Sequence, residues 1–225
     1  MGNSSNNNDI EFSWTHPYHM KIDSKEYTIP KYIQKRTERT SVVWKAISSD
    51  EVRKRPLVDA RKADYIIERL REVAPMAKYN DTPFFVAFGT MKPHMPFYFP
   101  EEFLRFYKEE DVHMPYNPYC PIDMPKIAWH RPTVLKFADC GSQELGISDL
   151  GKINVTFPPW KTKEIRRAYY AAISYVDHEI GRVLKEVKNL GLEENTIIVF
   201  WSDHGFQLGE LQSFSTCCMG KTNRI

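Results

Sequence analysis

Three features that would assign a broad class are missing from this chain of 225 residues. No apolar run approaches the roughly 20 residues that a membrane-spanning helix needs. None of the four cysteines stands in a Cys-x-x-Cys unit, which makes a zinc site or a thioredoxin-like site a weak interpretation. The charge is nearly balanced, with a net value of +2, so no global field steers the chain toward nucleic acid or a membrane surface.

The composition is that of a folded domain. Apolar residues make up 42% of the chain, charged residues 27% and aromatic residues 13%, which is enough to build a sizeable core. Residues 1–11 are rich in Asn and Ser and read as a polar leader without the apolar centre of a signal peptide. We expect a globular domain after this leader.

Two segments have helical periodicity. Residues 59–74 carry one apolar face, with Asp59 as the expected N-cap and Pro75 just past the end. Residues 161–190 carry a longer stripe, which Gly191 is expected to end. The stripe consists of Ile165, Ala168, Tyr169, Ala172, Ile173, Val176, Ile180, Val183, Leu184 and Val187.

Two short apolar runs predict strands buried on both faces, at 83–89 and 196–201. Residues 100–107 predict a short helix with proline in its first turn, and 111–160 predict a long proline-rich loop. Strand, loop, helix and strand in this order indicate an α/β fold, a largely parallel sheet flanked by helices.

Histidine and aspartate residues directly follow both predicted strands. His94 comes after the first, within Lys92-Pro93-His94, and Asp203 and His204 come after the second. Ligands of open α/β sheets bind beyond the carboxyl ends of the strands, so we expect these side chains to share one site.

The chemistry of these residues leaves two interpretations open. Asp203 offers carboxylate oxygen to a hard cation and His204 a second ligand or a proton donor, while Lys92 and His94 suit an oxyanion and its leaving group. Alternatively, Asp203 caps a turn, Lys92 is a surface lysine and His94 is bonded to a carbonyl group. From the residues alone, this second interpretation is favoured.

Three segments, in this order and spacing, resemble the sulfatase family. Lys-Pro-His-x-Pro-Phe at 92–97, together with Phe12-Ser13-Trp14 upstream, is similar to its iduronate-2-sulfatase branch. The other two are a helix and a strand end. They read Tyr-Ala-Ala-Ile-Ser-Tyr-Val-Asp at 170–177 and Trp-Ser-Asp-His-Gly at 201–205, the latter followed by Leu-Gly-Glu at 208–210. The resemblance covers 12–210 and leaves a tail, 211–225, unmatched.

The resemblance implies an alkaline-phosphatase-like α/β fold with a mixed central sheet. It implies hydrolysis of sulfate esters, here the 2-O-sulfate of iduronate in heparan and dermatan sulfate, in a lysosomal or secreted protein. By motif match, Asp203 and His204 would be ligands of one calcium ion, His94 the catalytic histidine and Lys92 a substrate-binding neighbour. The nucleophile of the family is a formylglycine made from cysteine.

The chain departs from the family pattern. It has no Cys-x-Pro/Ser-x-Arg motif to supply the formylglycine, and it lacks the paired aspartates that complete the family's calcium site. We therefore expect an incomplete catalytic domain, with sheet edges and apolar surface exposed, that binds calcium weakly and is inactive by itself.

Two alternatives remain. A phosphodiesterase or phosphatase of the same superfold would use Ser or Thr as nucleophile and two zinc ions. A non-catalytic glycan-binding fragment would explain the missing nucleophile.

Overall fold

A computed structural model describes residues 14–15, 43–125, 155–210 and 216–217. The chain divides into two compact units, Met1–Lys35 and Arg36–Ile225, and all elements discussed below belong to the second. The predicted leader 1–11, most of the tail 211–225 and the larger part of the predicted loop 111–160 lie outside the described residues.

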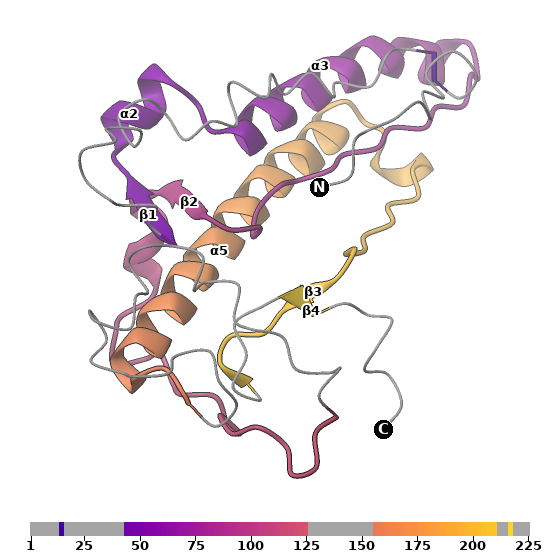
Figure 1. Ribbon diagram of the computed structural model, residues 1–225. Coiled ribbons are helices and arrows are strands. Elements are labelled where there is room, and N and C mark those ends of the chain that lie inside the picture. The colour runs from indigo at the N-terminus through magenta and orange to yellow at the C-terminus, as the bar shows by residue number, and fades with distance from the viewer. Residues whose placement is uncertain (1–13, 16–42, 126–154, 211–215, 218–225) are drawn as a thin grey trace. The chain divides into compact units, whose positions relative to one another are not determined.

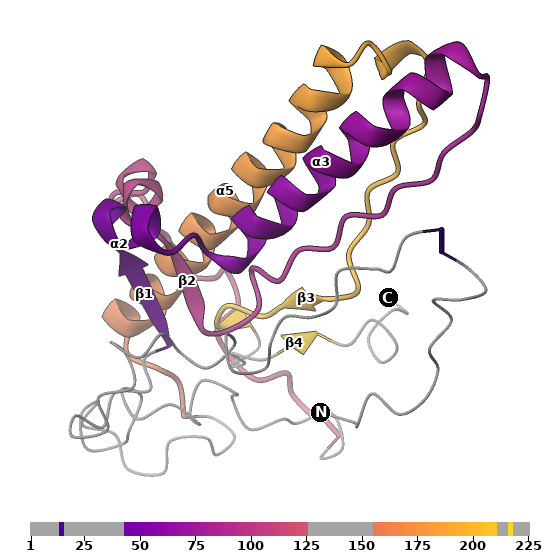
Figure 2. The ribbon, with the colours of Figure 1, turned by 90° about the horizontal axis from the view of Figure 1, so that it is seen from above.

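Two long helices, α3 (Val58–Tyr79) and α5 (Pro159–Asn189), pack side by side (Figures 1 and 2). Both were predicted from their apolar periodicity, and Gly191, at φ +62°, follows the end of α5 as expected. Their shared core consists of Ala63, Ile66, Leu70, Ala74, Val183, Val187 and Leu192. Arg71 Nε pairs with Glu186 Oε1 at 2.7 Å across the two helices.

Three details of the predicted helices were wrong. Asp59 does not cap α3, because the helix begins at Val58, and the buried Asp59 carboxylate binds the backbone of another segment instead. The helix also continues through Pro75 to Tyr79, and Asn80 N donates to Met76 O at 3.0 Å at its end. On α5 the buried stripe is narrower than predicted, since Ile173 and Leu184 are about 40% exposed.

A parallel pair of strands, β1 (Trp44–Ile47) and β2 (Phe97–Pro100), lies against α5, with Trp44 opposite Phe97. Neither strand was predicted. The predicted helix at 100–107 is a 3-10 helix, η1 (Glu101–Phe106). Side chains of β2, η1 and α5 form the second core cluster, which includes Phe97, Phe99, Phe103, Ile165, Ala168, Ala172 and Tyr175.

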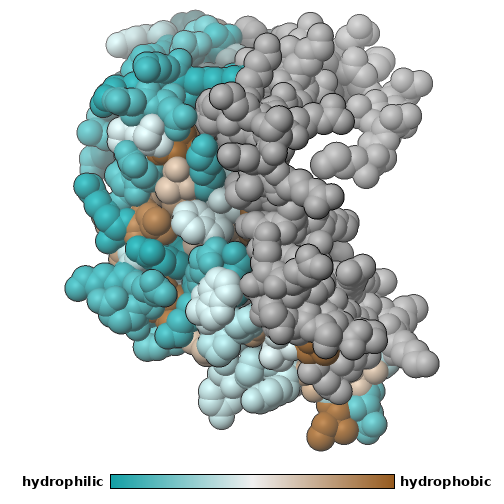
Figure 3. All heavy atoms as spheres, turned by 60° about the vertical axis from the view of Figure 1, so that its left-hand side comes forward, coloured by the Kyte–Doolittle hydropathy of each residue, from teal (hydrophilic) through white to brown (hydrophobic). Residues whose placement is uncertain are grey.

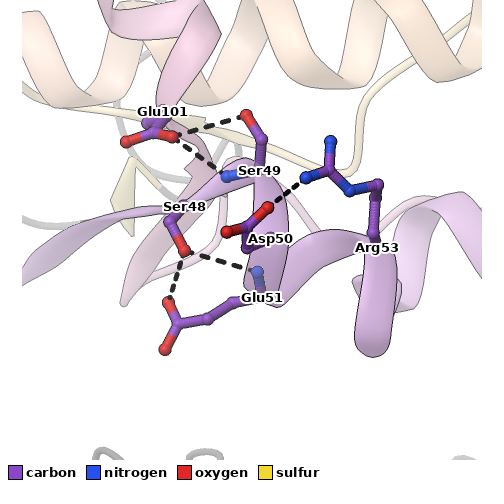
Figure 4. Close-up of polar contacts among 6 residues, drawn as sticks. All are labelled: Ser48, Ser49, Asp50, Glu51, Arg53 and Glu101. Atoms are coloured by element: carbon purple, nitrogen blue, oxygen red, sulfur yellow. Dashed lines mark hydrogen bonds and ion pairs between the residues drawn. The ribbon is translucent and has the colours of Figure 1, made fainter.

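The short helix α2 (Ser49–Lys54) connects β1 to α3 and is fixed at its N-terminus (Figure 4). The hydroxyl of Ser48, the N-cap residue, accepts a hydrogen bond from Glu51 N and donates one to the Glu51 carboxylate, both at 3.3 Å. Ser49 N donates to Glu101 Oε1 at 3.0 Å. This last bond ties α2 to η1.

The two predicted buried strands are not strands. Residues 83–89 are extended but belong to no sheet among the described residues. Phe84, Val86 and Phe88 alternate toward the core between α3 and α5, while Phe85 is 78% exposed. One face of this segment is therefore covered by helices and the other is not.

Residues 196–201 follow η5 (Glu193–Asn195) and are also extended without a sheet partner among the described residues. Their side chains are the most exposed large apolar group of the described chain: Ile197 is 92% exposed, Phe200 80% and Trp201 74%. A two-residue strand, β3 (Gly205–Phe206), follows and pairs antiparallel with β4 (Thr216–Cys217). The predicted exposure of apolar surface is thus observed.

The described residues on the face shown in Figure 3 are mostly hydrophilic, interrupted by small apolar patches. Among the described helices, none combines the length and the apolar character required to cross a bilayer.

The exposure of 196–201 predicts how substitutions behave. Replacing Ile197 and Phe200 with Thr should change the free energy of unfolding by less than about 0.5 kcal/mol, because little burial is lost. It should also reduce self-association and binding of an apolar dye, since the exposed apolar area shrinks. Denaturant titration and light scattering measure the two effects.

Val183→Thr is the control for this pair, because Val183 is buried between α3 and α5. It should cost more than about 1 kcal/mol without reducing self-association. Equal costs for both sets of substitutions would contradict the exposure of 196–201.

Candidate functional site

The loop that carries His94 is held by a buried carboxylate from α3. Asp59, 1% exposed, accepts hydrogen bonds from Met91 N at 2.6 Å and Lys92 N at 3.2 Å. Beside it, the hydroxyl of Tyr175 on α5 accepts a hydrogen bond from Ala60 N at 3.1 Å. Burial raises the pKa of Tyr175, with the carboxylates of Asp59 and Glu179 adding to the rise. The loop is therefore tied to the first turn of α3, and that turn is bonded to α5.

The ammonium group of Lys92 lies inside this loop. It donates to the carbonyl oxygens of His94 and Pro96, both at 2.8 Å, which leaves one N–H for another acceptor. Burial lowers the pKa of Lys92 to about 8, although the nearby Asp59 carboxylate acts in the opposite direction. Lys92 thus stabilises the loop, and its expected contact with substrate stays a prediction.

His94 is exposed at the tip of the same loop, between two cis X-Pro peptide bonds. His94 N donates to Met91 O at 2.9 Å, and the ring Nδ1 lies 2.5 Å from Met95 O. A carbonyl oxygen only accepts hydrogen bonds, so Nδ1 carries the proton of the neutral ring. The Nε2 atom is then left to accept a proton from solvent or to exchange one with a ligand.

Asp203 and His204 lie beyond the extended segment 196–201, as predicted. Asp203 is 85% exposed at its side chain, and its Oδ1 accepts from His204 N at 2.9 Å. The ring Nδ1 of His204 donates to Gly205 O at 3.0 Å, which places Nε2 3.4 Å from Asp203 Oδ2. Two acceptors at this distance repel one another unless a proton or a cation lies between them.

A metal site would need more ligands than these two residues supply. Asp203 is a suitable donor for a hard cation, but calcium takes six to eight oxygen ligands. Among the residues that the structure describes, no three His, Cys, Asp or Glu side chains come close enough to hold an ion. The described residues thus provide part of a donor set, and no reaction step is derived through a metal.

An arginine on α5 anchors the segment after Asp203 and His204. Arg166 Nη1 donates to Leu208 O at 2.9 Å and to Glu210 Oε1 at 2.6 Å, and Nη2 donates to Tyr170 OH at 2.9 Å. Partial burial acts to raise the pKa of Glu210, but the hydrogen bond from Arg166 and the backbone lower it. The Leu-Gly-Glu turn is thereby fixed to the helix.

Sequence reasoning named His94, Asp203 and His204 but not the residues that hold their segments, and the role of these three residues stays a prediction. No hydrogen bond or ion pair among the described residues joins the His94 loop to Asp203 or His204, so the expected shared site stays a prediction. Asp59 was predicted to cap a helix, and Tyr175 and Arg166 fell within the predicted helix 161–190 without an assigned role in the site. Their partners lie more than 30 positions away, so local pattern gave no signal for these contacts.

Comparison with known proteins decides the family. A model of the family described as "Sulfatase" matches residues 7–223, nearly the whole chain. The chain is a member of the sulfatase family. It is 31% identical to iduronate 2-sulfatase of Mus musculus over 213 residues and 32% identical to that of Homo sapiens over 209 residues. It is 34% identical to a sulfatase of Formosa agariphila over 177 residues.

Each alignment covers most of this chain but only about a third of the relative. Each iduronate 2-sulfatase alignment spans 92% of this chain but 36% of the relative, and the Formosa alignment spans 79% and 31%. The chain therefore spans about a third of the length of the curated relatives it matches.

The Asp59 contacts give a stability prediction. Asp59→Asn should lower the free energy of unfolding by about 2–3 kcal/mol. The carboxylate has one oxygen for each of the two backbone N–H groups of Met91 and Lys92, whereas the amide has a single oxygen. Asp64→Asn is the matched control on the same helix. It removes only the partly exposed ion pair with Arg182 and should cost less than about 1 kcal/mol. Similar costs in urea titrations would contradict the role of Asp59.

Lys92 gives a pH prediction. Its pKa is about 8 in the folded chain against 10.5 in the unfolded chain, so the unfolded state binds more protons between these values. The free energy of unfolding should therefore rise with pH in this window, by at most about 1.4 kcal/mol per pH unit from this group. Lys92→Met should flatten the rise, as measured by urea titrations from about pH 7.5 to 9.5.

Lys62 has a pKa lowered by burial and contributes in the same direction, so the informative quantity is the difference between wild type and Lys92→Met. Lys188→Met is the control, since this side chain is 72% exposed. A slope in Lys92→Met equal to that of wild type would contradict the burial of the ammonium group.

Proposed function

We propose that this sulfatase chain is part of the catalytic domain of a hydrolase that removes the 2-O-sulfate of iduronate in heparan and dermatan sulfate. The observation that carries the proposal is the loop at 91–96. Asp59 and Lys92 fix its backbone, while His94 is exposed with Nε2 available for proton transfer. A positioned histidine at an exposed loop tip is suited to general acid catalysis.

In this proposal His94 gives a proton to the sugar oxygen that leaves the sulfur atom. The remaining N–H of Lys92 faces a sulfate oxygen as a point charge. Asp203 and His204 contribute ligands to one calcium ion, whose other ligands come from residues outside this pair. The ion, when bound, stabilises the negative charge of the sulfate group.

The nucleophile does not come from the 225 residues, because they contain no Cys-x-Pro/Ser-x-Arg motif. Recombinant 1–225 should therefore release no sulfate from an aryl sulfate or from a 2-O-sulfated iduronate disaccharide. The protein is also purified from its source, where it is expressed from its own gene. Fractions whose peptide map contains both this sequence and a formylglycine peptide should release sulfate from the disaccharide. Turnover by recombinant 1–225 would refute the missing nucleophile.

The histidine is tested in the same source-expressed protein. His94→Gln should lower kcat by a factor of about 10²–10⁴, the usual contribution of a general acid. His113→Gln is the control, because His113 is also exposed and lies outside the loop. Release of phosphate rather than sulfate would favour the phosphatase alternative, and glycan binding without either activity would favour the non-catalytic one.

A further inference from the structure

A hollow beside the first turns of α5 has a composition that the proposed reaction does not use. Its volume is about 150 Å³, and it is lined by Trp44, Leu104, Glu109, Trp160, Glu164 and Arg167. None of these residues belongs to the His94 loop or to the segment that carries Asp203. Two indole rings, two carboxylates and one guanidinium group thus surround one small space.

The two indole rings are held differently. Trp44, on β1, stacks on the buried Phe99 ring with 6.2 Å between centroids and an interplanar angle of 4°, which fixes its orientation. Trp160, in the first turn of α5, is 53% exposed, and Lys161 Nζ lies 5.7 Å from its ring centroid. One wall of the hollow is therefore rigid, and the other offers an open aromatic face.

The polar groups leave capacity for a ligand. Glu164 Oε1 accepts from Trp44 Nε1 and from Lys161 Nζ, both at 2.8 Å, so its second oxygen is available. Arg167 Nε donates to Tyr107 O at 2.6 Å, and its terminal N–H groups have no partner among the described residues. Glu109 is exposed at the rim. The hollow thus offers both hydrogen-bond donors and acceptors beside its aromatic walls.

This combination matches one sugar ring. The C–H groups on one face of a pyranose pack on an indole, its hydroxyl groups donate to carboxylates, and a carboxylate or sulfate substituent accepts from a guanidinium fork. Glu164 is paired with Lys161, and Glu109 and Arg167 are the other two charged groups of the lining. Arg167 is the group that would bind an acidic substituent.

We propose that this hollow is a separate saccharide subsite that binds one acidic sugar ring of a glycan. The hollow and the turn after His204 contact adjacent residues of α5. Arg166 anchors that turn, and Arg167 lines the hollow. The choice of a glycosaminoglycan as its ligand rests on the proposed function, whereas the binding chemistry of the hollow does not.

The test is a calorimetric titration of the full 1–225 chain with an unsulfated disaccharide of a uronic acid and glucosamine. Trp160→Ala and Arg167→Gln should each weaken binding at least about tenfold. Trp201→Ala is the control, because Trp201 is 74% exposed and lies in the extended segment 196–201. It should leave the affinity unchanged. Thermal unfolding of each variant shows that the chain stays folded, as expected for exposed Trp160.

A second titration uses cellobiose, which has the same ring size but no acidic group. Wild type should bind cellobiose more weakly than the uronic acid disaccharide. Arg167→Gln should bind the two disaccharides with equal, weak affinity. Equal binding of the acidic disaccharide by wild type and Trp160→Ala, or no binding to wild type, would overturn the subsite. If source-expressed protein that contains the formylglycine peptide releases no sulfate while Trp160-dependent binding persists in 1–225, the proposed function is overturned and the subsite stands.

Discussion

The carboxylate of Asp59 connects the start of α3 to the backbone of the loop that presents His94. A buried carboxylate is tolerated only where hydrogen bonds replace the water it loses, and Met91 N and Lys92 N supply them. The same charge lies close enough to limit the fall in the pKa of the buried Lys92. Because Lys92 in turn bonds the carbonyl oxygens of His94 and Pro96, the position of the histidine depends on a residue that cannot itself reach a substrate.

The helices were predictable because their signal is local. An apolar residue every three to four positions must face a core, and α3 and α5 supply that core for each other. The ends were less predictable, since Asp59 found a partner on another segment, and Pro75 removes one N–H without stopping the helix. Strands depend on a neighbour that the same segment does not encode. Residues 83–89 have the composition and the alternation of a strand, yet no described strand pairs with them.

The candidate site shows the same limit at the scale of side chains. The order of motifs predicted His94 and Asp203 just past the ends of two buried strands, whereas both follow extended segments that pair with no described strand. The inward direction of Lys92 was not predictable, because two carbonyl groups created by the turn of the loop compete with any anion for its ammonium group. Arg166 likewise had no role assigned from the sequence, because its acceptors at Leu208 and Glu210 come from a later segment that returns to the helix.

The His94 loop is restrained by more contacts than the segment that carries Asp203, and one cause accounts for the difference. The His94 loop follows a segment whose inner face, with Phe84 and Val86, packs on α3 and α5, and its backbone is bonded to Asp59. Asp203 follows a segment whose side chains from Ile197 to Trp201 are all exposed. Its described hydrogen bonds reach only the next residue, His204. A sheet neighbour for 196–201 would bury the apolar side chains and restrain Asp203 at the same time. One neighbouring strand would therefore meet two needs, the burial of this apolar segment and the restraint of Asp203.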